Sequence, residues 1–400
     1  MAPEDSDAPS VAGSAGVRVF AETSRRRDGG NAMDMAAEEV ADRLGLEPGT
    51  RGRGYVEWLG EIPLEAAMFP EGRLPPFDLD DARALCGRLG LGDDDAAEVL
   101  STLPSPAREP EWWWCVERAV GRLVSHMGDF DAPRGTWPAW EGPRHGSARR
   151  CHLFHVALAV APFTLEYLRG PACRHVPEPL AWAALTDVSR LAGIHRRLYG
   201  SAGMDVGRWV ALCLRGEMFT LGRLQYNRLR LGGSDEGPVW YAEDEARELG
   251  DGFAVGDEGL GVHIPADSPL DPGLVDASIE MAWGFFARHF PLAAPRQRRI
   301  ATCRSWLLDP QLAEYLPAGS RILAFQRRFT LVPRVETGDR DVVQFVFGAT
   351  PADPDRPGSP VQLDLDARRG RTAMERAALE HLRSGAHWHR RTGWLELPAG

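Results

Sequence analysis

Residues 259–290, "GLGVHIPADSPLDPGLVDASIEMAWGFFARHF", decide the fold of this sequence because their pattern changes twice. Residues 259–264 are apolar and glycine-rich, as in a buried strand, and a proline ends that run. Helical spacing follows from residue 271. The stripe predicted to face the core is Leu274, Ser278, Met281, Ala282 and Phe285. A strand, a loop and a helix N-terminus can together hold an anion, because the first helical N–H groups lack partners within the helix.

The composition describes an acidic globular protein. The chain has 400 residues, of which 44% are hydrophobic and 26% charged, and this length is typical of two domains. A net charge of −11 argues against nucleic acid or an anionic membrane as a partner. All 46 basic residues are arginine, which excludes a Schiff-base lysine and the lysine of a phosphate-binding P-loop.

Cysteine usage and hydropathy predict a cytoplasmic protein. The six cysteines are scattered without a C-x-x-C pair, as is typical of reduced intracellular chains. The acidic, polar N-terminus does not resemble a secretion signal. The longest apolar run, 153–163, is too short to cross a bilayer and contains His155 and Pro162.

The sequence before residue 218 predicts helices almost throughout. Residues 1–30 are polar and rich in Gly and Pro, and we expect a disordered tail. Amphipathic spacing then predicts a helical N-terminal domain over residues 31–217, with Asp80 as one N-cap. One buried face is expected to contain Trp113, Val116, Val120 and Leu123. The helical runs are 33–46, 77–91, 93–103, 111–127, 150–170, 177–200 and 205–219.

From Met218 the pattern becomes a mixture of strands and helices. Residues 218–231, "MFTLGRLQYNRLRL", alternate as one half-exposed strand. Further expected strands are 237–243, 259–264, 298–308, 320–336, 341–349 and 391–397, with helices at 271–289, 309–316 and 371–385. Helices packed on a mixed sheet make the second domain, residues 218–400, an α+β domain, and the domain boundary falls near residue 217.

The order strand, loop, helix, strand, short helix, strand, strand resembles the GNAT fold of N-acetyltransferases. Three segments resemble, more narrowly, a bacterial family of acyltransferases that joins a helical N-acyltransferase-type N-terminal domain to a GNAT-like C-terminal domain. These segments are "VHIPADSPLDPGLVDASI" (262–279), "CRSWLLDPQLAEYLPAGSRILAFQRRF" (303–329) and "ALEHLRSGAHWHRRTGWLEL" (378–397). The resemblance extends over roughly residues 35–398 and is strongest in the second domain.

The resemblance implies acyl-CoA or acetyl-CoA as co-substrate. In GNAT enzymes the fourth strand splays from the fifth, the pantetheine arm inserts between them, and the pyrophosphate lies at the next helix N-terminus. Here those strands are 259–264 and 298–308. The positions implied to bind the cofactor are Val262, Ile264, Ser268, Leu270, Asp271 and Gly273.

The loop at residues 265–270 leaves two interpretations open. It lacks the glycine-rich GNAT pattern, and Asp267 and Asp271 would repel a pyrophosphate. Either Ser268 with Asp271 three positions later, or Asp271 with Pro272, could cap the helix and satisfy its N–H groups. The loop is therefore either a phosphate cradle or a structural corner.

Four residues are candidates for catalysis. His263 ends the fourth GNAT strand, and with an ordinary pKa of about 6.5 it could deprotonate an amine, or it could simply be a hydrogen-bonded strand end. Cys303 and Ser305 share one face of the fifth strand; Cys303 is either an acyl carrier or a small buried residue. Tyr315 lies where the resemblance places a general acid toward the departing thiolate, although packing is the alternative.

The sequence does not indicate a metal site. Cys151, His152, His155, Cys173 and His175 lack the paired spacing of zinc ligands. We therefore predict an acyl-CoA-dependent N-acyltransferase that acts on an amine of a small molecule or peptide. The alternative is a non-catalytic ligand-binding or regulatory module on a GNAT-like scaffold. A splayed pair of strands distinguishes the first reading, because continuous pairing would close the pantetheine slot.

Overall fold

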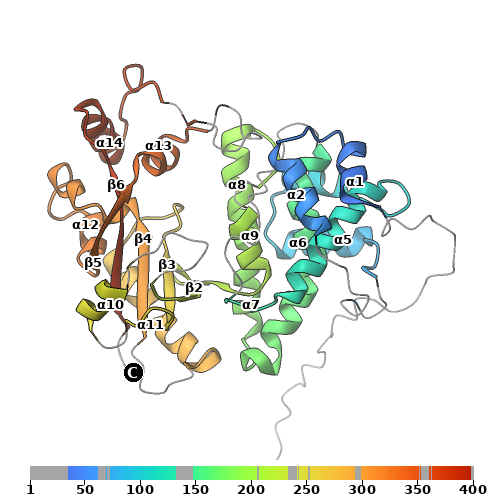
Figure 1. Cartoon of the computed structure of the whole chain (residues 1–400), viewed down its shortest axis with the longest axis horizontal. Helices are drawn as coiled ribbons and strands as arrows, with labels where there is room; N and C mark the ends of the chain where they lie inside the picture. Colours follow the sequence, from blue (N-terminus) through green and yellow to red (C-terminus); the bar gives the residue numbers. More distant parts are fainter. Residues whose placement is uncertain are drawn as a thin grey trace, which may run out of the picture.

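The computed structural model describes residues 35–61, 69, 73–131, 147–204, 207–232, 241, 243–250, 253–292, 299–350, 352, 360–361 and 363–397. The predicted tail at residues 1–30 and most of the predicted strand at 237–243 lie outside these ranges. Figure 1 shows a helical half beside a half built on a sheet. The helices of the first half are α1 (Ala37–Arg43), α2 (Arg51–Gly60), α3 (Leu79–Arg88), α4 (Asp93–Ser101), α5 (Pro110–Ser125), α6 (Ser147–Arg169), η4 (Pro171–Cys173), α7 (Glu178–Leu185), α8 (Asp187–Tyr199) and α9 (Gly207–Leu214).

Local capping and amphipathic spacing explain these helices. α5 begins with Pro110, and its buried face includes the four residues predicted from spacing, Trp113, Val116, Val120 and Leu123. The expected cap of α3 was wrong by two residues: Asp78, not Asp80, accepts hydrogen bonds from the N–H groups of Asp80 and Asp81. Asp80 itself contributes an acidic first turn, which is favourable at the same helix end.

α6 runs through the centre of the helical half. Its segment Arg150–Arg169 is long and apolar enough to cross a membrane. However, 67% of its most apolar 18-residue stretch is buried inside the protein, as in a core helix. The apolar run at 153–163 was expected to be too short to cross a bilayer, but the helix that contains it continues past Pro162 to Arg169. Since proline lacks an N–H group, the carbonyl of Leu158 loses its usual partner there.

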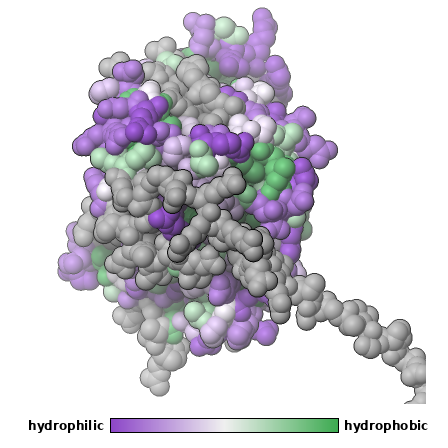
Figure 2. All heavy atoms as spheres, turned by 90° about the vertical axis from the view of Figure 1, so that its right-hand side faces the viewer, coloured by the Kyte–Doolittle hydropathy of each residue, from purple (hydrophilic) through white to green (hydrophobic). Residues whose placement is uncertain are grey.

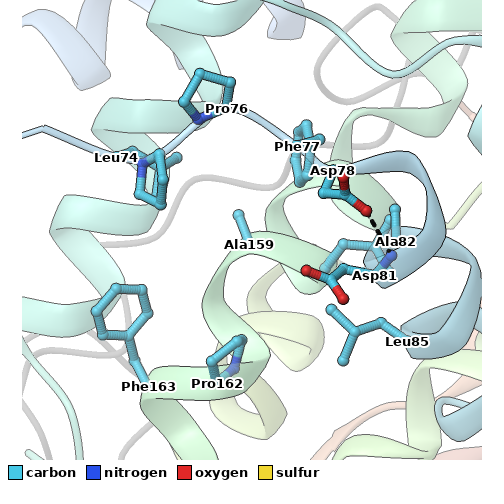
Figure 3. A pocket seen from close by; sticks show the side chains of 12 residues that line it. Leu74, Pro76, Phe77, Asp78, Asp81, Ala82, Leu85, Ala159, Pro162 and Phe163 are labelled. Atoms are coloured by element: carbon cyan, nitrogen blue, oxygen red, sulfur yellow. Dashed lines mark hydrogen bonds between the residues drawn. The ribbon is translucent and has the colours of Figure 1, made fainter. Parts of the chain in front are cut away.

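A hollow of about 430 Å³, a volume that includes open solvent, lies beside Pro162 of α6. Figure 3 shows Leu74, Phe77, Pro162 and Phe163 around it, with Asp81 at its edge. The outer face of the helical half is otherwise mostly hydrophilic where described residues are seen (Figure 2).

The sheet half contains six strands in the order β1-β2-β3-β4-β6-β5. The strands are β1 (Met218–Leu221), β2 (Leu224–Arg230), β3 (Glu258–His263), β4 (Ile300–Ser305), β5 (Thr330–Thr337) and β6 (His389–Glu396). All neighbours are antiparallel except β3 and β4, which are parallel. The helical elements of this half are α10 (Glu243–Leu249), α11 (Pro272–His289), η5 (Trp306–Leu308), η6 (Pro310–Glu314), α12 (Arg321–Gln326), α13 (Asp339–Phe347) and α14 (Ala373–Arg383).

Three strand predictions were wrong. Residues 218–231 form a hairpin, because Gly222 takes a positive φ of 71° and turns the chain between β1 and β2. The first part of 320–336 is α12, since the Ser320 side chain caps it. Residues 341–347 belong to α13, which is capped by Gly348 with φ 64°. An apolar run this short has no decisive period.

The core-facing stripe of α11 is rotated from the predicted one. Leu274 and Met281 are 58% and 48% exposed. The buried positions are Val275, Ser278, Ala282, Phe285, Phe286 and His289. Ser278 fixes this orientation: its Oγ donates to the Leu221 carbonyl and accepts from the Leu224 N–H at 3.0 Å.

The two halves share one hydrophobic core. Leu168, Cys173 and Ala181 of the helical half pack in the same cluster as the sheet and α11. α7 and α9 both contact β1. Arg215 and Glu217 form a buried ion pair where the chain passes from the helical half to the sheet. Arg215 Nε lies 2.8 Å from Glu217 Oε1. The relative position of the halves is therefore set by packing.

Two buried histidines make the helical half sensitive to acid. Burial lowers the pKa of His152 to about 3 and that of His155 to about 4, so both are neutral in the folded protein and protonate near 6.5 when unfolded. Stability is thus present above pH 6.5 and lost as the pH falls toward 4. We expect each histidine to cost ~1 kcal/mol per pH unit in this window, measured by thermal unfolding between pH 7.5 and 5. In His155→Gln the stability should depend less steeply on pH. The same pH dependence in the variant and the parent protein would show that His155 does not cause the loss of stability in acid.

Candidate active site

The parallel ladder between β3 and β4 is only two residue pairs long. Leu260 pairs with Ala301 and Gly261 with Thr302, and both strands then continue without further pairs between them. β3 stays paired with β2 as far as His263, and β4 with β6 as far as Ser305. The two strands therefore part at their carboxyl ends, which is the arrangement that a pantetheine slot requires.

The two faces of the sheet differ at this opening. Leu260, Val262 and Cys303 point to the face covered by α11 and belong to its hydrophobic core. Because side chains alternate along a strand, His263 points to the opposite face. Its neighbours there come from β2, where Gln225 is its register partner, together with the buried Asn227. One face is thus apolar and the other polar.

His263 is held by two side chains. Its Nε2 lies 2.7 Å from Asn227 Oδ1, and the Asn227 amide nitrogen donates to the Arg228 carbonyl at 2.8 Å. Since that amide nitrogen is the donor to Arg228, Oδ1 is the atom that faces the histidine and must accept from Nε2–H. In the neutral ring the lone pair is then on Nδ1. Trp209 of α9 meets the ring edge to face, with centroids 4.5 Å apart.

Gly261 makes the contact between Asn227 and His263 possible. A Cβ at this position would lie 2.4 Å from Asn227 Oδ1 and 3.2 Å from His263 Nε2. The glycine therefore has a packing role here, since its φ is not positive.

A buried carboxylate lies behind this site. Asp187, the first residue of α8, accepts from Arg190 at 2.6 and 2.9 Å. It also accepts from Trp209 Nε1 and Gln225 Nε2, both at 2.7 Å. Burial favours the neutral acid, but the bonds from these donors outweigh it and hold the pKa of Asp187 below its ordinary value. Asp187 could not be predicted from the sequence, because Trp209 and Gln225 are distant from it in the chain.

The helix start at α11 uses the second of the two predicted caps. Asp271 Oδ1 accepts from the N–H groups of Gly273 at 3.1 Å and Leu274 at 3.4 Å. Val275 N–H bonds the Asp271 carbonyl, and Pro272 has no N–H group. All first-turn donors are therefore engaged, while Ser268 is exposed. Cofactor contacts at Val262, Ile264, Ser268, Leu270, Asp271 and Gly273 stay a prediction.

Arg223, which follows the hairpin turn at Gly222, holds the loop at residues 265–270 in place. Its guanidinium donates to the carbonyls of Pro265, Ser268 and Pro269 at 2.9, 2.5 and 2.9 Å. These bonds fix the loop backbone against β1 and β2. The corner interpretation of this segment is therefore supported by the contacts of the loop itself.

The other three catalytic candidates do not converge on His263. Cys303 is buried on the opposite face, where burial raises the pKa of its thiol to about 12. The Ser305 hydroxyl accepts from the Leu307 N–H at 3.1 Å and caps η5. The Tyr315 hydroxyl lies 3.0 Å from His381 Nδ1 in a separate cluster with Trp388. These contacts favour the packing alternative for Cys303 and structural roles for the other two.

A charged cluster lies on the same sheet face as His263. Arg304 of β4 is two residues beyond Thr302, the last residue of β4 that pairs with β3, and its side chain points to the polar face. Arg304 Nη2 lies 2.6 Å from Glu336 Oε2, which Arg390 also contacts at 3.1 Å. Arg390 reaches Asp341 at 3.4 Å.

Among the described residues, no group of His, Cys, Asp or Glu could hold a metal ion.

A mixed sheet whose parallel pair, β3 and β4, is joined by only two residue pairs, with α11 packed on one face, is the arrangement of the GNAT-like acyltransferases. Two family models match the chain: an N-acyltransferase N-terminal domain over residues 80–216 and a GNAT-like C-terminal domain over residues 218–395. Together they include most of the sequence.

Solved structures of an acyltransferase are similar over nearly the whole chain. One is in complex with decanoyl-CoA and teicoplanin, and another, a mutant, with octanoyl-CoA. Each is 34% identical, matches 91% of this chain and 100% of its own, and has a TM-score of 0.71. No match was found among curated proteins.

The chain therefore belongs to this N-acyltransferase family with a GNAT-like C-terminal domain. The predicted fold class, a helical N-terminal part followed by a GNAT-like mixed sheet, is confirmed. The prediction of acyl-CoA as co-substrate agrees with these relatives, whose structures contain octanoyl-CoA, decanoyl-CoA or CoA.

Gly261→Ala should damage the site locally. The new methyl group overlaps Asn227 Oδ1, so we expect a loss of about 1–3 kcal/mol in the free energy of unfolding, measured by denaturant titration. The hydrogen bond between His263 Nε2 and Asn227 Oδ1 should be lost, which a change in the histidine ¹⁵N NMR signals would show. Gly284→Ala is the matched control, since nothing lies within 4 Å of its Cβ position on α11. Equal behaviour of the two variants would contradict the packing role of Gly261.

Proposed function

We propose that this protein transfers a medium-length acyl group from acyl-CoA to an amine of a polar small molecule or peptide, with His263 as the general base. One observation carries the proposal: His263 lies at the opening between β3 and β4, on the polar sheet face, with its ring fixed by Asn227 and Trp209. The thioester would enter through the opening, and the acceptor amine would approach from the polar face.

The reaction follows from this placement. The amine nitrogen attacks the thioester carbonyl as His263 Nδ1 takes its proton, and a C–N bond forms. Backbone N–H groups along the parted strand edges would stabilise the oxyanion. The C–S bond then breaks, the electron pair goes to sulfur, and the proton passes from the imidazolium to the departing thiolate. The products are an amide and free CoA.

The polar face supports an acceptor rich in hydrogen-bonding groups. Arg304, Glu336 and Arg390 lie on the same sheet face as His263 and contain both hydrogen-bond donors and acceptors. Similar structures contain teicoplanin together with decanoyl-CoA, and 10C-teicoplanin together with CoA. A glycopeptide of this kind has the size and polarity that such a face can recognise. Octanoyl and decanoyl groups in the relatives point to a medium chain length.

The alternative, a binding module without turnover, has one observation in its favour. The Asp271 cap occupies the N–H groups at the α11 start that a pyrophosphate uses in typical GNAT enzymes. Binding of acyl-CoA without release of free thiol in the presence of any amine acceptor would favour this alternative.

His263→Gln tests the base directly. Glutamine can keep a hydrogen bond to Asn227 but cannot accept a proton, so kcat for amide formation should fall ~10²–10⁴-fold. The assay follows thiol release from decanoyl-CoA with teicoplanin and simpler amino sugars as acceptors. Binding of decanoyl-CoA, measured by calorimetry, should change less than ~3-fold. His175→Gln, at an exposed histidine elsewhere, is the control. An unchanged kcat in His263→Gln would remove the residue from the mechanism.

Cys303→Ala separates direct transfer from a covalent acyl-enzyme. A thiol buried in the core with a raised pKa is not a nucleophile, so kcat should stay within ~3-fold of the parent protein. Mass spectrometry of the protein with decanoyl-CoA alone should show no added acyl mass. A decanoyl adduct that disappears in Cys303→Ala would establish a covalent path and contradict direct transfer.

A further inference from the structure

The carboxylate of Asp187 joins three elements that surround the candidate base. It lies at the start of α8 and is only 5% exposed. Trp209 belongs to α9 and Gln225 to β2, and each donates its side-chain N–H to a different carboxylate oxygen. Arg190, one turn further along α8, supplies two more donors. The Cys213 thiol lies 3.7 Å from Oδ2.

The two neutral donors both reach His263. The Trp209 ring packs edge to face on the imidazole, with an interplanar angle of 89°. Gln225 is paired with His263 across the β2–β3 ladder, so its side chain lies on the same face as the imidazole. Gln225 Nε2 also donates to Thr220 Oγ1 at 3.0 Å. Trp209, which contacts the imidazole, and Gln225, its register partner on the same face, therefore both bond to one carboxylate.

The charges around Asp187 explain why the group is suited to this task. Arg190 balances the negative charge of Asp187. Burial lowers the pKa of Arg190, but Asp187 and also Asp267, in the loop before α11, raise it above its ordinary value. Burying a charged carboxylate is costly unless it is paired and fully hydrogen-bonded, and here both conditions are met. Such a network has few alternative arrangements, so it fixes the angle of each donor.

We propose that Asp187 is the positioning residue for His263: it holds Trp209 and Gln225 against the imidazole and so couples the packing of the helical half to the orientation of the base. This inference rests on the proposed function for its kinetic consequence. Its structural consequence, a fixed imidazole ring, can be measured without any acceptor.

Asp187→Ala should affect turnover more than binding. With Trp209 and Gln225 released, kcat should fall ~10–100-fold while KM for decanoyl-CoA changes less than ~2-fold. Asp95→Ala is the matched control, because Asp95 is also a buried carboxylate and pairs with Arg196 of the same helix α8, whereas Trp209 and Gln225 donate to Asp187. Both variants should lose stability, but only Asp187→Ala should lose kcat.

The ring of His263 provides a second readout. In ¹⁵N NMR of histidine-labelled protein, the signal that His263→Gln removes should show protonated Nε2 in the parent protein and in Asp95→Ala. In Asp187→Ala the signal should keep the Nε2 proton, because Asn227 still fixes the tautomer, but it should shift and broaden because the Trp209 ring no longer packs at one angle on the imidazole. If Asp187→Ala does not fold, Trp209→Phe and Gln225→Leu, each of which removes one donor to the carboxylate, carry the same test.

The two proposals fail in different ways. If the parent protein transfers no acyl group to any amine, the proposed function fails, and the NMR comparison still decides the role of Asp187. If Asp187→Ala keeps the kcat of Asp95→Ala and an unchanged His263 signal, Asp187 is only structural and the inference is overturned.

Discussion

The short parallel ladder between β3 and β4 is the constraint on which the rest of the site depends. Two residue pairs hold the strands together, and each strand then follows its other neighbour, β2 or β6. The opening therefore needs no strained backbone. Beyond Gly261 and Thr302 no further residue pairs join β3 to β4, and backbone N–H and C=O groups in a protein require partners. A pantetheine arm, itself an amide chain, can supply them.

The helical half also contributes to the site at the ends of β3 and β4. It shares a hydrophobic cluster with α11 and the sheet, and it supplies Trp209 and Asp187 next to His263. Removing one partner from a buried charge network typically costs ~3–5 kcal/mol, so the orientation of the two halves is strongly specified at this point. This gives a physical reason for a catalytic sheet that carries a large helical partner: the polar side of the opening is built by both.

Much of the fold could be predicted from periodicity, and much of the site could not. The β3–loop–α11 succession, the buried face of α5 and the position of His263 at a strand end follow from local pattern. The stripe of α11 was missed because two helical faces fit the spacing, and only the Ser278 contacts with the hairpin select one. α12 and α13 were missed because short apolar runs lack a decisive period. Asp187, Trp209, Asn227 and Gln225 were missed because their chemistry arises from contacts between distant segments.

The position of an acyl-CoA thioether analogue in a crystal structure tests the central claim most directly. The account predicts a pantetheine arm between β3 and β4 beyond the two ladder pairs, with the acyl carbonyl beside His263 and the CoA phosphates on the α11 side. An analogue bound elsewhere, with β3 and β4 paired continuously to His263 and Arg304, would contradict it.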